Sequence, residues 1–383
     1  MTRKRIPIVD CYFGLICAFP IATMLIDGTI INKLLFASLV VIQIYLFFAK
    51  RLTLRSFLLI FFLILHYLFV ILITDFPIAN NNLLFYYPFF LAYTYFIYDN
   101  IDGMHTYVNG KIGFIKVVIN IWTVLVGVSI VVPDCYYIKE GGGLYFGSWA
   151  GSIFRLGPSA MFIQVLAIML QTIGKQRYAT IYSLIPLYCV FMGSSRTYLF
   201  IGACLFIISW YVFCGSKRKF WVSFVPLAAI FLLLFLSSSI LEKILYTLDE
   251  EQYGDFWFRL TSGRSDFWKK NLVAWSDMPL INKFFGSSIN FTYKITGLWA
   301  HNDFIEIVCS FGIVGVLQYV FAMNSLIRKS WSGSRIPLAI KFSVVLVWLF
   351  NAFFNMHYVY FCAMLCYPFL TITIGSYFKT END

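Results

Sequence analysis

The strongest constraint on this chain is an apolar run of about twenty residues that recurs about twelve times. A helix needs roughly 20 apolar residues to cross about 30 Å of hydrocarbon. Of the 383 residues, 60% are hydrophobic and only 12% are charged, too few polar groups for a water-soluble surface of this size. We therefore predict an all-α, polytopic transmembrane helix bundle of about 12 spans, a single integral membrane domain over residues 1–383. The predicted spans are centred on Leu15, Leu39, Ile64, Leu91, Val124, Val165, Ile185, Phe206, Leu232, Val314, Val345 and Met364.

The basic residues set the expected orientation, because Lys and Arg are concentrated in cytoplasmic loops. Alternate connections carry them, while residues 75–82 and 355–357 carry none. Both termini are therefore predicted in the cytoplasm, and the net charge of +11 reflects topology and gives no reason to expect nucleic acid. The basic residues on the predicted cytoplasmic side are Arg3, Lys4, Arg5, Lys50, Arg51, Arg55, Lys175, Arg177, Lys217, Arg218, Lys219, Arg328, Lys329 and Arg335.

Two outer loops are longer than a simple connection requires, and long loops commonly carry function. Residues 133–154 form the smaller one, with a flexible tip expected at Gly141, Gly142 and Gly143. Residues 242–302 form the larger one, in which helical spacing predicts an amphipathic helix over residues 265–276. The apolar face is expected to carry Trp268, Leu272 and Trp275, with Lys269, Lys270 and Asn271 mostly elsewhere.

Arg196 is the first candidate for anion binding. It follows Gly193-Ser194-Ser195 between two apolar runs, at the outer mouth of the bundle. A charge at the bilayer centre costs roughly 2.5 to 3.5 kcal/mol, so a near-membrane arginine without carboxylate neighbours suits an anionic ligand. The alternative is a side chain that snorkels to lipid headgroups.

Arg264 opens the predicted loop helix, where free backbone N–H groups and the helix dipole favour anions. A guanidinium at that place suits a phosphate or diphosphate. The alternative is a local ion pair with Asp255 or Asp266. Arg155 and Arg259 are further outer-side cations that we expect to contribute to substrate binding.

His301 lies directly before an apolar helix, in Ala300-His301-Asn302-Asp303-Phe304. An unperturbed imidazole titrates near pH 6.5 and can accept a proton from a sugar hydroxyl, although a lone histidine is more often structural. Asp303 and Glu306 can be explained as an N-cap and its capping-box partner. His357 also faces outward but has no comparable cluster.

Several kinds of chemistry lack support in the sequence. No Asp-x-Asp pair occurs in an outer loop, and no glycine-rich phosphate loop or Ser/His/Asp spacing is present. The nine cysteines show no CxxC pairing, and only Cys135 falls in an outer loop. We therefore expect no metal, no cofactor and no disulfide.

Three segments together resemble the O-antigen polymerase and O-antigen ligase family of envelope glycosyltransferases. The resemblance covers roughly residues 178–319, including an outer loop of about sixty residues. The segments are Ser195-Arg196-Thr197, Ser262-Gly263-Arg264 with Trp268, and His301-Asn302 followed by Phe311-Gly312-Ile313-Val314-Gly315.

The resemblance implies a metal-independent transferase in the bacterial inner membrane whose donor is a glycan on undecaprenyl diphosphate. It implies Arg196 and Arg264 as a diphosphate clamp, and His301 as base or orienting group for the acceptor hydroxyl. Trp268 and Asn302 are then expected to bind substrate. Membrane lipid and a chain-length regulator protein are the implied partners. The opening Gly263-Arg264-Ser265-Asp266-Phe267-Trp268 looks more like a polymerase, which joins lipid-linked repeats, than a ligase, which transfers the glycan to lipid A-core.

A different class of protein also fits twelve spans. A lipid-linked oligosaccharide transporter or flippase would carry ionisable residues at mid-membrane. Here His66 and Lys116 are the clearest examples, and neither has an obvious partner in the sequence. Because the candidate residues lie at the outer surface instead, a transferase is favoured over a transporter, receptor or assembly scaffold.

Overall fold

Helices account for nearly all of the structure that can be described. The computed structural model describes residues 7–25, 30–49, 52–73, 83–138, 144–236, 241, 245, 247–249, 254–356 and 361–380. The helices are α1 (Pro7–Leu25), α2 (Ile30–Ala49), α3 (Leu54–Leu72), α4 (Leu83–Asp99), α5 (Ile101–Asn109), α6 (Ile112–Ser129), α7 (Ile153–Thr172), α8 (Ile181–Met192), α9 (Arg196–Cys214), α10 (Lys217–Leu236), α12 (Phe256–Leu260), α13 (Arg264–Ser276), α14 (Leu280–Phe285), α15 (Phe291–Thr296), α16 (Asp303–Trp331), α17 (Leu338–Phe354) and α18 (Phe361–Thr380).

The predicted helical class is confirmed, whereas the number of spans is not. Each of the twelve predicted span centres lies within a separate helix. Among the described residues, six helices are long and apolar enough to cross a membrane: α1, α3, α6, α7, α9 and α16. Others are shorter, such as α8, whose 12 residues extend only about 18 Å. The structure thus fits a membrane protein, and an apolar run does not always yield a full-length span.

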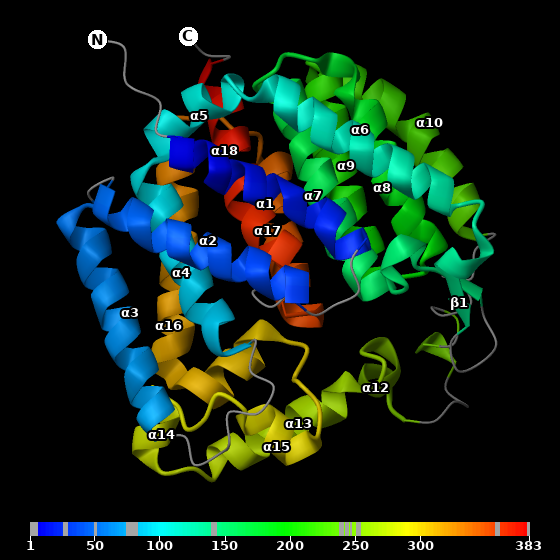
Figure 1. Cartoon of the computed structure of the whole chain (residues 1–383). Coiled ribbons are helices and arrows are strands. Elements are labelled where there is room, and N and C mark those ends of the chain that lie inside the picture. Colours follow the sequence, from blue (N-terminus) through cyan, green and yellow to red (C-terminus); the bar gives the residue numbers. More distant parts are fainter. Residues whose placement is uncertain are drawn as a thin grey trace.

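Helix α7 forms the centre of the bundle, packed against α1, α8, α9 and α18 (Figure 1). Almost all of its residues are buried. At Gly157 a Cβ atom would lie 2.2 Å from the Tyr198 ring, so only glycine lets α9 approach this closely. Deeper along α7, the Gln164 amide donates to the carbonyls of Ser183 and Gly202, both at 3.1 Å. Close packing and a buried polar link therefore fix α7, α8 and α9 together.

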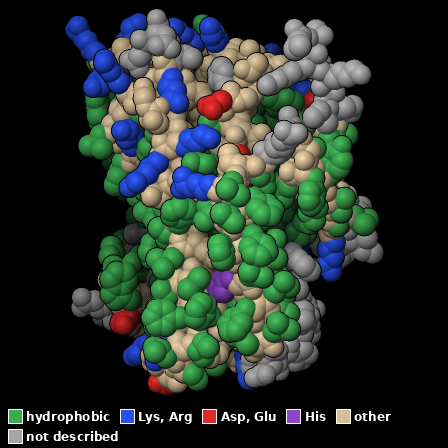
Figure 2. Space-filling model, turned by 90° about the vertical axis from the view of Figure 1, so that its left-hand side faces the viewer, with side chains coloured by type: hydrophobic (Ala, Val, Ile, Leu, Met, Phe, Trp, Pro, Cys, Tyr) green, Lys and Arg blue, Asp and Glu red, His purple; other side chains and the backbone are tan. Residues whose placement is uncertain are grey.

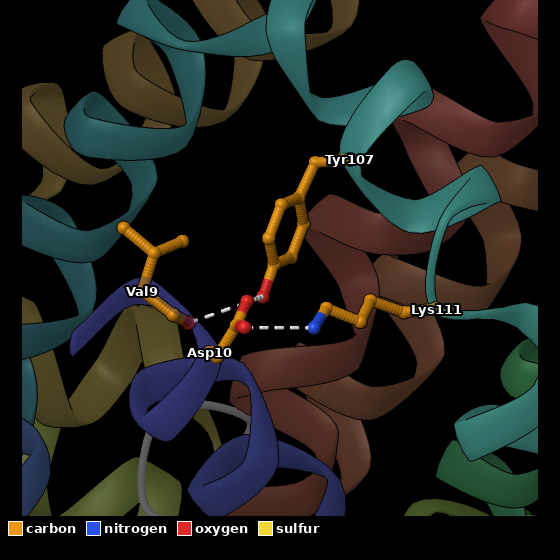
Figure 3. A network of polar contacts seen from close by, with 4 residues as sticks. All are labelled: Val9, Asp10, Tyr107 and Lys111. Carbon is orange, nitrogen blue, oxygen red and sulfur yellow. Dashed lines mark hydrogen bonds and ion pairs between the residues drawn. The ribbon is translucent and has the colours of Figure 1, made fainter. Parts of the chain in front are cut away.

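The two ends of the bundle differ. One end, here the terminal end, holds the start of α1 and the end of α18; the opposite end, here the loop end, holds α12 to α15 (Figure 1). At the terminal end Lys111 pairs with Asp10 at 2.9 Å, and the Tyr107 hydroxyl donates to the same carboxylate at 2.8 Å (Figure 3). These contacts join α1 to the α5 and α6 segment.

The molecular surface has the banded character of a protein that lies in a bilayer. On the side that carries α2 and α3, hydrophobic side chains cover the middle, and Lys and Arg gather toward the terminal end (Figure 2). Exposed apolar residues there include Phe48, Phe62 and Leu72. In water such a surface would be unfavourable, but against lipid it carries no cost.

The smaller outer loop contains a short β-hairpin that the sequence did not predict. Strand β1 (Tyr136–Ile138) pairs antiparallel with β2 (Leu144–Phe146), and Tyr137 lies opposite Tyr145. The 3-10 turns η1 (Pro133–Cys135) and η2 (Ser148–Ala150) flank it. The predicted glycine tip at residues 141–143 lies outside the described residues.

In the larger loop, the predicted amphipathic helix is present. Its buried face was predicted only in part, since Trp268 and Trp275 are half-buried and Lys269 and Lys270 are exposed. Helix α13 begins one residue before the expected start and ends at the expected residue. Its one fully buried side chain is Asn271, whereas Leu272 is 40% exposed. The reason is that α13 packs along the start of α16, where the Cys309 thiol contacts the Asn271 carbonyl at 3.8 Å. The helix therefore turns a partly polar face inward.

Helix α16 is interrupted at Gly312, whose φ of 68° and ψ of −172° are not helical. The end of α14 packs into this break. A Cβ at Gly312 would lie 2.3 Å from the Phe284 carbonyl oxygen, and one at Gly286 would lie 2.3 Å from the Ser310 carbonyl oxygen. Both positions thus require glycine, since the two backbones touch. The contact fixes the first nine residues of α16 against the loop.

Candidate functional site

The three segments singled out in the sequence meet at the loop end. Arg196, at the start of α9, donates to the Ser262 hydroxyl at 2.7 Å and to the Thr247 hydroxyl at 2.8 Å. Ser262 lies two residues before Arg264. At the other end of α13's first turn, the Trp268 indole donates to the Ala300 carbonyl at 2.6 Å. The beginnings of α9, α13 and α16 are therefore linked by hydrogen bonds across more than a hundred residues of sequence.

Strained backbone marks each of these three segments. Among non-glycine residues in the described part of the chain, five have positive φ, and three of them are Ser194, Ser262 and His301. The left-handed conformation costs an L-residue roughly 1 to 2 kcal/mol. Each strained residue lies within two residues of the first residue of a helix. Such strain persists where the surroundings hold it in place, and it is frequent at functional sites.

Arg264 lies beside His301 and at the end of α17. Its guanidinium donates to the backbone carbonyl of Phe354, at the C-terminal end of that helix, where a cation is favourable. Asp255, one of the two predicted ion-pair partners, caps α12 by accepting from the Phe258 N–H at 2.7 Å. Arg264 thus connects α13, α16 and α17.

The histidine is held in its neutral form. Burial and the nearby positive charge of Arg264 lower the pKa of His301 from 6.5 to about 4. Within the described part of the chain, its Nδ1 atom has no hydrogen-bond partner. A neutral imidazole with a free nitrogen can accept a hydrogen bond from a hydroxyl group.

The start of α16 differs from the predicted capping box. Asn302 is the N-cap, since its side chain accepts from the Ile305 N–H at 3.1 Å. Asp303 is fully buried and accepts from the Tyr319 hydroxyl at 2.7 Å. Glu306 is buried as well and accepts from the Thr292 hydroxyl and from the Ala300 N–H. The capping-box explanation is therefore wrong: Glu306 fixes the loop to α16, and Asp303 joins the parts of α16 before and after Gly312.

The residues expected to bind substrate have different surroundings. Asn302 is 2% exposed, and its amide oxygen is used to cap α16. Arg259 is also buried, and donates to the carbonyls of Thr247 and Gly254. Arg155 is half-buried in the first turn of α7. Trp268 is half-buried, and its indole donates to the carbonyl of Ala300, the residue before His301.

Sequence reasoning missed Thr247 and Tyr319, and named Ser262 only as part of a motif. Thr247 accepts from Arg196 through its hydroxyl and from Arg259 through its carbonyl, so it connects two of the predicted cations. Small hydroxyl residues are common everywhere, and nothing in their spacing marked these. The Ser262-Gly263-Arg264 segment was noted, but the hydrogen bond from Arg196 to Ser262 was not predicted.

The structure also explains His66 and Lys116, the two clearest ionisable residues within predicted spans. His66 has two partners that the sequence did not reveal: the Phe285 carbonyl at 2.8 Å from Nε2, and the Gln318 amide oxygen at 3.1 Å from Nδ1. It thus ties α3 to the end of α14 and to α16. Lys116 is exposed on α6, five residues from Lys111, where it can extend toward headgroups. His357 lies outside the described residues.

No family model matches this chain, and no curated protein matches it at a significant level.

Proposed function

We propose that this protein is a metal-independent glycosyltransferase that joins undecaprenyl-diphosphate-linked oligosaccharide repeats, in the manner of an O-antigen polymerase. The observation that carries the proposal is the meeting of Arg196, Arg264 and His301 at one end of an apolar bundle. We further propose that the loop end faces the periplasm of a bacterial inner membrane, with both termini cytoplasmic. The gathering of Lys and Arg toward the terminal end supports this orientation (Figure 2).

The proposed reaction is a substitution at the anomeric carbon of the donor glycan. The acceptor hydroxyl oxygen forms the new glycosidic bond, while the bond from that carbon to the diphosphate oxygen breaks. Undecaprenyl diphosphate leaves with the electron pair, and Arg264 and Arg196 stabilise the negative charge that develops on it. Starts of helices α9, α13 and α16 contribute favourable N-terminal dipoles.

We assign His301 to the binding of the acceptor hydroxyl. Because its pKa is lowered to about 4, its imidazole is neutral at pH 7 and accepts a hydrogen bond from the attacking hydroxyl. A group of such low basicity has little tendency to take the proton early. We therefore favour an orienting role, in which His301 receives the hydroxyl proton only as the new bond completes.

Exposed aromatic side chains of the loop supply surfaces on which sugar rings can stack. Trp257 is 63% exposed and Tyr293 is 51% exposed, and the Tyr293 ring lies 5.3 Å from that of Trp299. Their positions near the loop helices suit a long glycan that extends away from the lipid.

The proposal is tested by gel analysis of cell-surface lipopolysaccharide from a deletion strain complemented with variants. The deletion strain is expected to show a single repeat unit on lipid A-core. Arg264→Ala is expected to give the same pattern at normal membrane levels, because the proposed diphosphate clamp then keeps only one of its two guanidinium groups. Lys270→Ala is the matched control, since Lys270 is an exposed cation on the same helix, and it is expected to restore the full ladder.

Other lipopolysaccharide gel patterns would indicate a different function. Bare core with accumulated lipid-linked polymer identifies the ligase. Repeat units retained on the cytoplasmic side identify a transporter. A wild-type ladder from Arg264→Ala removes Arg264 from the site.

A further inference from the structure

An apolar groove of about 470 Å³ opens on the side of the bundle. Helices α3, α4 and α16 form its walls. Several lining side chains are strongly exposed, with Phe62 at 59% and Leu317 at 62%. The polar members of the lining are Tyr95, Gln318 and Asn324. The groove is therefore shaped for an apolar chain with a few polar atoms beside it.

Two cations stand at the end of this groove that faces the terminal end. The Arg55 guanidinium lies 5.5 Å from the ring centroid of Phe321, a groove residue, and 5.7 Å from that of Tyr98. On the same tyrosine, the Lys329 ammonium lies 4.4 Å from the ring centroid and donates to the Tyr98 carbonyl at 2.7 Å. Cation–π contacts thus hold both charges over the mouth of the groove.

Among the described residues, neither cation forms an ion pair with an acidic side chain. In the described residues, the one salt bridge within 4.0 Å is that of Lys111 with Asp10, so neither Arg55 nor Lys329 has one. Asp99, which follows Tyr98 in the sequence, accepts from the Thr53 N–H at 3.0 Å and the Ser56 hydroxyl at 2.9 Å and is not ion-paired with either cation. Two neighbouring cations with no direct carboxylate contact among the described residues favour an anion from outside the chain.

The length of the groove indicates which kind of lipid fits it. Along α3 the lining runs from Leu59 to Leu63, which lie about 6 and 12 Å from Arg55 at 1.5 Å per residue. That depth falls within one leaflet, half of about 30 Å of hydrocarbon. At its inner limit is Gln318, which is bonded to His66. The dimensions fit an acyl chain whose headgroup stays beside Arg55.

We propose that this groove binds an anionic diacyl phospholipid of the leaflet next to the terminal end. Its phosphate contacts Arg55 and Lys329, and one acyl chain lies along Phe62, Leu63 and Leu317. The site is separate from the proposed glycan site and does not depend on the transferase activity.

The experiment is native mass spectrometry of the full-length protein, delipidated in detergent and titrated with dioleoyl phosphatidylglycerol or dioleoyl phosphatidylcholine. Wild type is expected to retain phosphatidylglycerol at about tenfold lower lipid concentration than phosphatidylcholine. Arg55→Gln is expected to remove most of this preference, and Arg55→Gln with Lys329→Gln all of it. Leu317→Trp, which fills the groove and keeps both charges, is expected to weaken binding of both lipids.

Lys116→Gln is the matched control, because Lys116 is an exposed cation of α6 away from the groove, and it should keep the wild-type preference. If the double variant does not fold, the single variant Arg55→Gln tests the proposal, because the Arg55 side chain is exposed and its replacement should not disturb folding. Equal retention of the two phospholipids by wild type overturns the proposal, as does an unchanged preference in Arg55→Gln. Tighter retention of a polyprenyl phosphate than of phosphatidylglycerol overturns the choice of a diacyl lipid.

Discussion

Replacing Gly312 by alanine tests the contact between α14 and α16 directly. The new Cβ would lie 2.3 Å from the Phe284 carbonyl oxygen and 2.5 Å from the Gly286 nitrogen, both backbone atoms that no rotamer change can move. The backbone conformation itself, with φ of 68° and ψ of −172°, is one that essentially only glycine adopts. The variant must therefore separate the two helices or straighten the break.

The expected cost has two parts. Holding alanine in that conformation costs about 1 to 3 kcal/mol, and forcing a methyl group into a close-packed contact costs about 1 to 3 kcal/mol more. Gly297→Ala is the control, because Gly297 also has a positive φ of 72° but a Cβ there meets nothing within 4 Å. It should lose only about 1 to 2 kcal/mol.

The assay is thermal unfolding of the purified variants in detergent, followed by tryptophan fluorescence, with the lipopolysaccharide ladder as a second readout. Gly312→Ala is expected to lower the unfolding temperature at least twice as much as Gly297→Ala, and to reduce polymer because the start of α16 is displaced. Equal shifts for the two variants would show that the backbones do not touch as described.

Three further predictions concern the same region. The pKa of His301 is about 4 in the folded protein and 6.5 in the unfolded chain, so the unfolded chain binds more protons between these pH values. The free energy of unfolding should therefore fall by up to about 3 kcal/mol as the pH drops from 6.5 to 4. His301→Gln should flatten that dependence of unfolding temperature on pH; an unchanged slope contradicts the assignment. Tyr319→Phe removes the donor to buried Asp303 and should cost about 1.5 to 3 kcal/mol by the same assay. Trp268→Phe keeps a ring but loses the bond to Ala300, and should cost about 1 kcal/mol, so a loss above 3 kcal/mol would mean that more than this bond is involved.

Hydrophobic periodicity predicted the helices well, because this pattern depends on the sequence of one helix alone. The start of α13 was predicted within one residue, and each predicted span centre falls in a helix. The burial of Asn271 on α13 was not predictable, because Asn271 is inside only by virtue of packing against Cys309 and α16. Likewise, the apolar pattern continues through Gly312 and gives no sign of the break there.

For the candidate site, sequence could select residue types but not their partners. Arg196 stood out because charge is costly near a membrane. Arg264 stood out because it opens a predicted helix, and His301 because an imidazole titrates near neutral pH. That Arg196 contacts Ser262, and that Arg264 reaches the carbonyl of Phe354, depends on how distant helices pack. Arg259 is an example: we expected this cation to bind substrate, but its side chain is buried and donates to the backbone carbonyl of Thr247.

The break in α16 also bears on how deep in the bilayer the proposed transfer would take place. Beyond Gly312, residues 313–331 extend about 28 Å, which matches the hydrocarbon thickness of about 30 Å. Before it, residues 303–311 add about 13 Å that need not lie in hydrocarbon. If the longer part spans the membrane, His301 lies in the aqueous or headgroup layer. A polyprenyl donor could then react with its isoprenoid tail still embedded, while its glycan moves in water.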